Sequence, residues 1–223
     1  MDTLRDRWVP YSQRAARPLN VIIVGAGIGG LTAGISLSQT GHSVTILERV
    51  NKIDEVGAGI QLAPNASRIL NRLGVLEEIM EHATVLERVS IRRYSGDDEL
   101  STVPLMPAQG AANAIEDAAV LATALTCTAD VKLALKMYEV IRKDRGEQIA
   151  ASAAKTAHTL HLPDGPEQRD RDEAIVSGTQ NPDRWSNGQW QDYMYGVDVM
   201  KATVDLWNVM QERTVVRSRQ VNL

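Results

Sequence analysis

Three glycines near the start of the chain have the spacing that suits a bound nucleotide. Gly25, Gly27 and Gly30 fit the pattern G-x-G-x-x-G and follow the β-branched run at 21–24. In this pattern the first glycine turns the chain sharply, and the second lets a pyrophosphate approach the backbone. The third lets the following helix pack against the strand. The spacing therefore predicts a dinucleotide site at this turn.

The segments around the glycines complete a βαβ unit. The uninterrupted apolar run at 21–24 is typical of a parallel strand covered on both faces. We expect a helix at 28–39, whose N-terminal N–H groups and positive dipole end would face the phosphates. A second strand at 43–47 then delivers Glu48, whose carboxylate can accept hydrogen bonds from ribose hydroxyls and would repel a 2′-phosphate. The alternative is that the glycines only form an ordinary tight turn between the strand and the helix. That alternative does not explain why an acidic residue, Glu48, follows the second strand.

Composition argues against several other functions. The 223 residues carry a net charge of −4 without a sustained basic run, which argues against nucleic acid as a partner. Cys127 is the only cysteine, which excludes an internal disulfide, and its apolar neighbours indicate a buried, inert thiol. His158, His161 and Asp164 lie close together, but the turn at Asp164 and the lack of a further ligand argue against a metal site.

The chain carries no segment that suggests a membrane or a secreted location. No apolar run has the length that a bilayer crossing needs. The first 19 residues lack the hydrophobic core of a signal peptide, so we expect a disordered leader at 1–19 and a cytoplasmic protein.

Beyond the βαβ unit, the pattern predicts a hairpin and several helices. Small residues at 57–59 could let the backbone lie against a ligand. The helix that begins near 109 would bury a stripe containing Ile115, with Glu116 and Asp117 on its other side. Asp130 is a plausible N-cap for the next long helix. The remaining expected elements are helices at 64–73, 76–82, 130–155 and 197–212, strands at 85–94 and 100–105 with Val85 inward, a polar loop at 167–183, and a frayed tail up to 223.

These segments resemble the single-component FAD-dependent monooxygenases, especially the salicylate-hydroxylase-like branch. The resemblance covers 21–93 and resumes from 104 to 200. It rests on five blocks in family order: the glycine unit at 20–49, DEVGAGIQLAPNASRILNRLGVLEEI at 54–79, PAQGAANAIEDAAVLATAL at 107–125, HLPDGPEQRDRD at 161–172, and NPDRWSN with YMYGVD at 181–198.

The resemblance implies an α/β fold. It consists of a Rossmann-like, glutathione-reductase-like FAD-binding domain at 20–125 and a helical C-terminal region at 126–223. It also implies FAD as cofactor, NAD(P)H as co-substrate, and an aromatic or polyketide-like small molecule as substrate, in a secondary-metabolite or aromatic-compound pathway. The implied FAD contacts are Gly25, Gly27, Gly30, Glu48, Arg49, Ala58, Gly59, Gly110 and Ala111, with the helix that starts near Gly110 facing the flavin end.

The chain departs from the family pattern at one place. A long central segment of the family is missing between Tyr94 and Pro104. That segment carries most of the substrate-binding β-sheet, the Asp-Gly motif associated with NAD(P)H, and the Gly-Asp pair that contacts the FAD ribityl chain. We therefore expect an incomplete sheet, with the substrate β-sheet domain largely absent and 101–105 as a candidate replacement strand.

The reaction that the resemblance implies is carried by the flavin. NAD(P)H would reduce FAD, and one oxygen atom of O₂ would pass to an aromatic carbon. We find no side-chain constellation that would identify a catalytic residue. Two alternatives stay open, namely a noncatalytic remnant and an interaction module that forms homo- or hetero-oligomers through the helices at 130–155 and 197–212. A simple NAD-dependent dehydrogenase fits the glycine unit equally well, but the later blocks disfavour it.

Overall fold

The computed structural model describes residues 14–15, 17–52, 59–96, 98–103, 109–179 and 181–221. Its fold is mixed α/β and mostly helical, with two small sheets. Ala58 and residues 104–108, which belong to segments singled out in the sequence, lie outside this description. Of the helices that are described, none combines the length and the apolar character that a membrane crossing requires.

The expected βαβ unit is present, and its only difference in bounds is that the first strand begins one residue earlier than predicted. Strand β1 (Asn20–Val24) pairs in parallel with β2 (Ser43–Leu47), so that Asn20 lies opposite Ser43 and Val24 opposite Leu47. Helix α1 (Ile28–Gln39) connects the two strands. The β-branched run and the glycines that follow it thus specify this unit locally, because strand propensity and turn chemistry agree.

One face of this parallel sheet is uncovered. Val21 and Ile23 point inward and pack against the buried residues of α1 and the central helices. Ile22 and Val24 point the other way and are 68% and 85% exposed. The prediction of a strand covered on both faces is therefore wrong. The side chains alternate along the strand, and none of the described elements packs on the second face.

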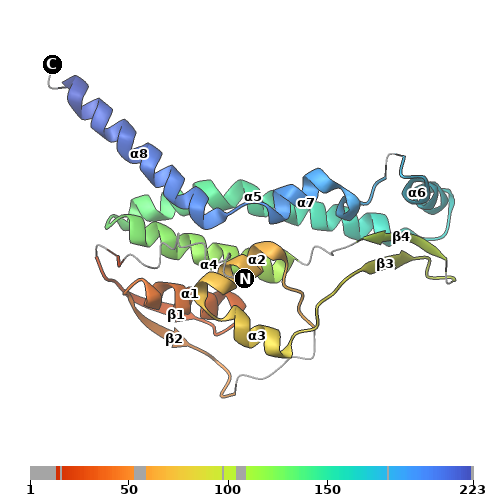
Figure 1. The fold of residues 1–223 in the computed structure, drawn as a ribbon, viewed down its shortest axis with the longest axis horizontal. Helices are drawn as coiled ribbons and strands as arrows, with labels where there is room; N and C mark the ends of the chain where they lie inside the picture. Colours follow the sequence, from red (N-terminus) through yellow and green to blue (C-terminus); the bar gives the residue numbers. More distant parts are fainter. Residues whose placement is uncertain are drawn as a thin grey trace, which may run out of the picture.

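The second sheet is an antiparallel hairpin at a distance from the first (Figure 1). Strand β3 (Val89–Arg92) pairs with β4 (Glu99–Val103). The hairpin was predicted, but its first strand begins at Val89, and Val85 is 69% exposed rather than inward. The suggestion that 101–105 replaces a strand of the parallel sheet is also wrong, because β4 pairs with β3.

The helices follow the predicted order, with three differences. Helix α7, at Gly188–Tyr195, was not predicted. The segment predicted as a polar loop at 167–183 contains a helix, α6, which begins with Pro166 in its first turn and buries Ile175. The last helix continues to Val221, where a frayed tail had been expected after 212. The helices are α2 (Pro64–Leu73), α3 (Leu76–His82), α4 (Gln109–Cys127), α5 (Val131–Leu160), α6 (Pro166–Ser177), the 3-10 turn η2 (Arg184–Ser186), α7 (Gly188–Tyr195) and α8 (Val199–Val221).

Asp130 caps α5 as predicted. Its carboxylate accepts hydrogen bonds from the N–H groups of Lys132 and Leu133 at 2.9 and 3.2 Å. These bonds satisfy two of the N–H groups that a helix leaves without internal partners. The helix runs past 155 to Leu160, and this extra turn brings its C-terminal end beside the hairpin (Figure 1).

Helix α4 is the centre of the fold. It packs against α1, α2, α5 and α8, and two groups of buried apolar residues meet along it. The first group joins α4 to α2 and α8, and the second joins it to α1 and α5. Leu206, Trp207 and Met210 of α8 pack against the second group, so this part of α8 is engaged within the chain. Oligomerisation through the C-terminal helices stays a prediction.

The domain limits also stay predictions. Most of the expected leader at 1–19 lies outside the described residues, but Ala15 is buried and its N–H donates to Thr40 O at 2.9 Å. Leu19 N–H donates to His42 Nδ1 at 3.1 Å. The residues just before β1 are thus held against the end of α1.

Candidate nucleotide-binding site

The turn between β1 and α1 needs glycine at two positions. Gly25 has a φ of +106°, a conformation in which an L-residue with a side chain would be strained. Its N–H donates to Leu47 O at 2.7 Å. A Cβ on Gly30 would lie 2.0 Å from Gly25 O, well inside van der Waals contact. Gly25 therefore turns the chain, and Gly30 lets α1 approach the end of the strand, as the spacing predicted.

Gly27 is different, because open space surrounds it. A Cβ placed there would meet nothing within 4 Å, although the residue has the ordinary extended backbone of an N-cap. No side chain caps α1 at this end, and its first turn contains no acidic residue. The N–H groups of the first turn lack partners within the helix and carry its positive dipole end. This cradle fits a pyrophosphate that approaches the backbone at Gly27.

Glu48 lies beside the same turn, at the end of β2. Its Oε2 accepts a hydrogen bond from Ala26 N–H at 2.7 Å, and its Oε1 accepts one from Val50 N–H at 3.0 Å. These backbone hydrogen bonds, that from Ala26 first, lower the pKa of Glu48 below its ordinary value of 4.5. The carboxylate is exposed and ionised at neutral pH, and Arg49 beside it is also exposed.

The start of α4 lies close to the start of α1. A Cβ on Gly29 would lie 3.4 Å from Ala114 Cβ, so the first turn of α1 packs against α4 at this residue. Ala114 is about one helical turn from Gly110. Gly110 is exposed and a Cβ there would meet nothing within 4 Å, whereas Ala111 is half-buried. The fold thus brings the first turn of α1 to α4 about one helical turn beyond Gly110.

The structure does not bring every predicted site residue to this turn. Ala58 lies outside the described residues. Gly59 is described and exposed, and a Cβ there would meet nothing within 4 Å, so no close contact links it to another part of the chain. The roles of Ala58 and Gly59 stay predictions.

A buried charge cluster fixes the first turns of α4 to their neighbours. Glu116 has no exposed surface, which overturns the prediction that it lies on the outer side of α4. Both of its carboxylate oxygens accept hydrogen bonds from Arg145, at 2.8 and 2.9 Å, and Arg142 forms a further ion pair with it. Asn65 of α2 donates to Glu116 Oε1 at 2.8 Å.

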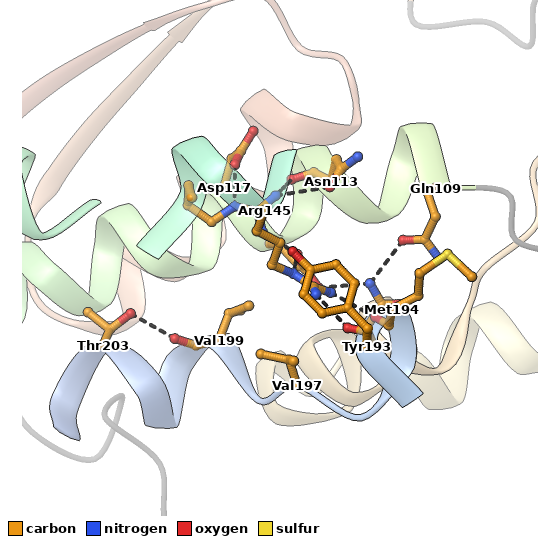
Figure 2. Close-up of polar contacts among 12 residues, drawn as sticks. Gln109, Asn113, Asp117, Arg145, Tyr193, Met194, Val197, Val199 and Thr203 are labelled. Carbon is orange, nitrogen blue, oxygen red and sulfur yellow. Dashed lines mark hydrogen bonds and ion pairs between the residues drawn. The ribbon is translucent and has the colours of Figure 1, made fainter. Parts of the chain in front are cut away.

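One of these arginines, Arg145, also links the cluster to α7. Arg145 also donates to the carbonyl oxygens of Tyr193 and Met194, at 2.6 and 2.7 Å, as Figure 2 shows. Its guanidinium lies 5.3 Å from the centroid of the Tyr193 ring. The spacing of residues in the sequence could have indicated that Glu116 is buried. Positions 112, 115, 116 and 119 lie on one face of the helix, and this face includes the buried stripe.

The single thiol and the histidines do not form a site in this structure. Burial raises the pKa of Cys127 to about 11, which agrees with an inert thiol. Asp164 accepts a hydrogen bond from the Tyr94 hydroxyl at 2.6 Å, and His161 Nδ1 pairs with Ala157 O. Within the described ranges, no group of three His, Cys, Asp or Glu side chains has the arrangement that could hold a metal ion.

Comparison with known proteins connects the region of this turn with FAD. Residues 18–103 match the family model described as FAD binding domain. The matched residues make up less than half of the chain. The match covers β1, α1, β2 and the hairpin, so the glycine turn and Glu48 lie inside it. FAD is the cofactor of this domain family, and the residues at the turn fit its pyrophosphate and ribose.

The chain is similar over part of its length to proteins named as monooxygenases or hydroxylases. The FAD-dependent monooxygenase OpS4 of Beauveria bassiana is 42% identical over 84 residues, which are 38% of this chain and 20% of that protein. The 3-hydroxybenzoate 6-hydroxylase 1 of Aquipseudomonas alcaligenes is 40% identical over 86 residues, which are 39% and 22%. The 3-amino-4-hydroxybenzoate 2-monooxygenase PtnB3 of Streptomyces platensis is 38% identical over 85 residues, which are 38% and 22%. The chain thus matches about a fifth of the length of these relatives.

Proposed function

We propose that the chain binds FAD and serves as an FAD-dependent monooxygenase of a small aromatic molecule, with NAD(P)H and O₂ as co-substrates. The observation that carries the proposal is the open cradle at Gly27, bordered by the first turn of α1 and the carboxylate of Glu48. The relatives named for 3-hydroxybenzoate and 3-amino-4-hydroxybenzoate support a single-ring aromatic acid as the substrate class.

Each part of the turn has a defined task in this proposal. The N–H groups at the start of α1 would bind the pyrophosphate, and the close approach at Gly27 would let them reach it. Glu48 would accept hydrogen bonds from the ribose hydroxyls, in the ionised form that its backbone partners favour. The positive end of α4 at Gly110 and Ala111 would stabilise negative charge at the other end of the cofactor.

FAD, when bound, supplies the electron transfer from NAD(P)H and the activation of O₂. The chain's own contribution is to bind, to orient and to provide positive helix ends, since we assign no proton-transfer residue. We further propose that the β1–α1–β2 unit is the Rossmann-like part of a glutathione-reductase-like domain. The described parallel sheet has only two strands, β1 and β2, which supports an incomplete sheet and with it the proposal that the substrate β-sheet is largely absent.

The direct test is a visible absorption spectrum after FAD has been added to the purified chain and the excess removed. We expect the absorption bands of bound oxidised flavin at near-stoichiometric occupancy. Turnover of NAD(P)H with single-ring aromatic acids would then be measured on the flavin-loaded protein. A chain that is folded by circular dichroism and yet retains no flavin would overturn the proposal.

Glu48→Gln should weaken FAD binding and change its pH dependence. Loss of the charged acceptor is expected to lower the affinity on the order of tenfold at neutral pH. In the parent chain the affinity should be constant from about pH 8 to about pH 5. It should then fall as the pH drops through the lowered pKa of Glu48, because protonation removes an acceptor. A fluorescence titration of FAD at several pH values tests this prediction. If the fall in FAD affinity at low pH were unchanged in Glu48→Gln, a group other than Glu48 would cause it.

A further inference from the structure

A hollow of about 380 Å³ lies between the start of α4, the second half of α5, and α7. Its walls are mostly apolar and contain several small residues, which is why the helices leave a space there. Ala153 and Ala157 line it from α5, Met194 from α7, and Gly110 from α4. The size and the apolar walls suit a single aromatic ring.

One end of the hollow is polar. Gln109 lines it and is 6% exposed, and its side-chain nitrogen Nε2 is buried without a hydrogen-bond partner. The oxygen of the same amide accepts a bond from Asn65 at 3.1 Å, which holds the side chain in place. Gln109 is also the first residue of the 19-residue helix α4. Its buried side-chain nitrogen is therefore the donor at this end of the hollow.

A charge cluster lies beside the hollow and is balanced. Glu116 and Asp117 pair with the two arginines Arg142 and Arg145, so these four groups carry no net charge. Arg145 also donates to the carbonyl oxygen of Met194, which lines the hollow. The cluster thus holds one wall of the hollow in place.

We propose that this hollow binds the aromatic acid substrate, with the ring among the small residues of α5 and the carboxylate at the side-chain nitrogen of Gln109. The assignment rests on the proposed function for the class of substrate. Gly110 lines the hollow, and Ala114 one turn further along α4 contacts Gly29, so the substrate site and the nucleotide turn adjoin along one helix.

Two neighbouring alanines of α5 give a matched test. Ala153→Leu would fill the hollow, whereas Ala154 is the next exposed alanine of the same helix and does not line it. Binding of 3-hydroxybenzoate to the full chain would be measured by ligand-detected NMR titration, with and without FAD. We expect Ala153→Leu to weaken binding by about tenfold or more and Ala154→Leu to leave it unchanged.

A second pair of measurements tests the polar end. Gln109→Leu should weaken binding of 3-hydroxybenzoate more than binding of 3-hydroxybenzamide, a neutral molecule with the same ring, because the lost donor faces the carboxylate. Equal binding of 3-hydroxybenzoate to the parent chain and to folded Ala153→Leu would overturn the site, and so would an absence of binding to a chain that retains flavin. A chain that retains no flavin and still shows the Ala153 dependence would support the site while refuting the proposed monooxygenase function.

Discussion

Replacing Glu116 with Gln is expected to lower the free energy of unfolding by about 3–5 kcal/mol. The substitution keeps the size and shape of the side chain and removes only its charge. Arg142 and Arg145, which are 3% and 6% exposed, would then be left without the carboxylate that both of them contact. A buried charge that loses its partner retains the full cost of its removal from water. Urea unfolding followed by circular dichroism measures this loss.

An exposed ion pair of the same type provides the control. Glu139 pairs with Lys136 at 2.7 Å on the surface of α5, where both side chains are at least half exposed. Glu139→Gln should change the free energy of unfolding by less than about 1 kcal/mol. Equal losses in Glu116→Gln and Glu139→Gln would show that the buried cluster does not hold α4 to its neighbours.

Replacing Gly27 with Val is expected to reduce FAD affinity on the order of a hundredfold while the fold is retained. The backbone at Gly27 is extended, a conformation that Val adopts readily, and a side chain there would meet no protein atom within 4 Å. The side chain would instead occupy the space through which a pyrophosphate reaches the N–H groups of α1. Because glycine is the better N-cap, the free energy of unfolding should fall by about 1 kcal/mol at most. FAD titration and urea unfolding of the same preparation separate the two effects.

Gly30→Ala is the matched contrast in the same turn. Its Cβ would lie 2.0 Å from Gly25 O, so α1 could not keep its position against the end of β1. We expect the free energy of unfolding to fall by more than about 2 kcal/mol in the absence of FAD. If Gly27→Val left FAD affinity unchanged in a folded protein, the assignment of this turn to the pyrophosphate would be wrong.

The sequence by itself determined the unit from Asn20 to Glu48. Its strand, turn, helix and second strand follow from interactions between near neighbours, namely β-branched residues in the strand and glycines where the turn and the helix contact demand them. The hydrogen bond from Gly25 to Leu47 closes within the same short unit. The cap at Asp130 was predictable for the same reason, since its side chain bonds to N–H groups two and three residues away.

Only the tertiary structure decided the side on which Glu116 lies, the separation of the two sheets, and the uncovered face at Ile22 and Val24. An acidic residue in a helix is normally placed on the solvent side, since burial of an unpaired charge is costly. Glu116 is buried because α2 and α5, far away in the sequence, supply Asn65, Arg142 and Arg145 around it. The position of a charge is set by these distant partners, whereas a turn is set by its own residues, and only the latter can be read along the chain.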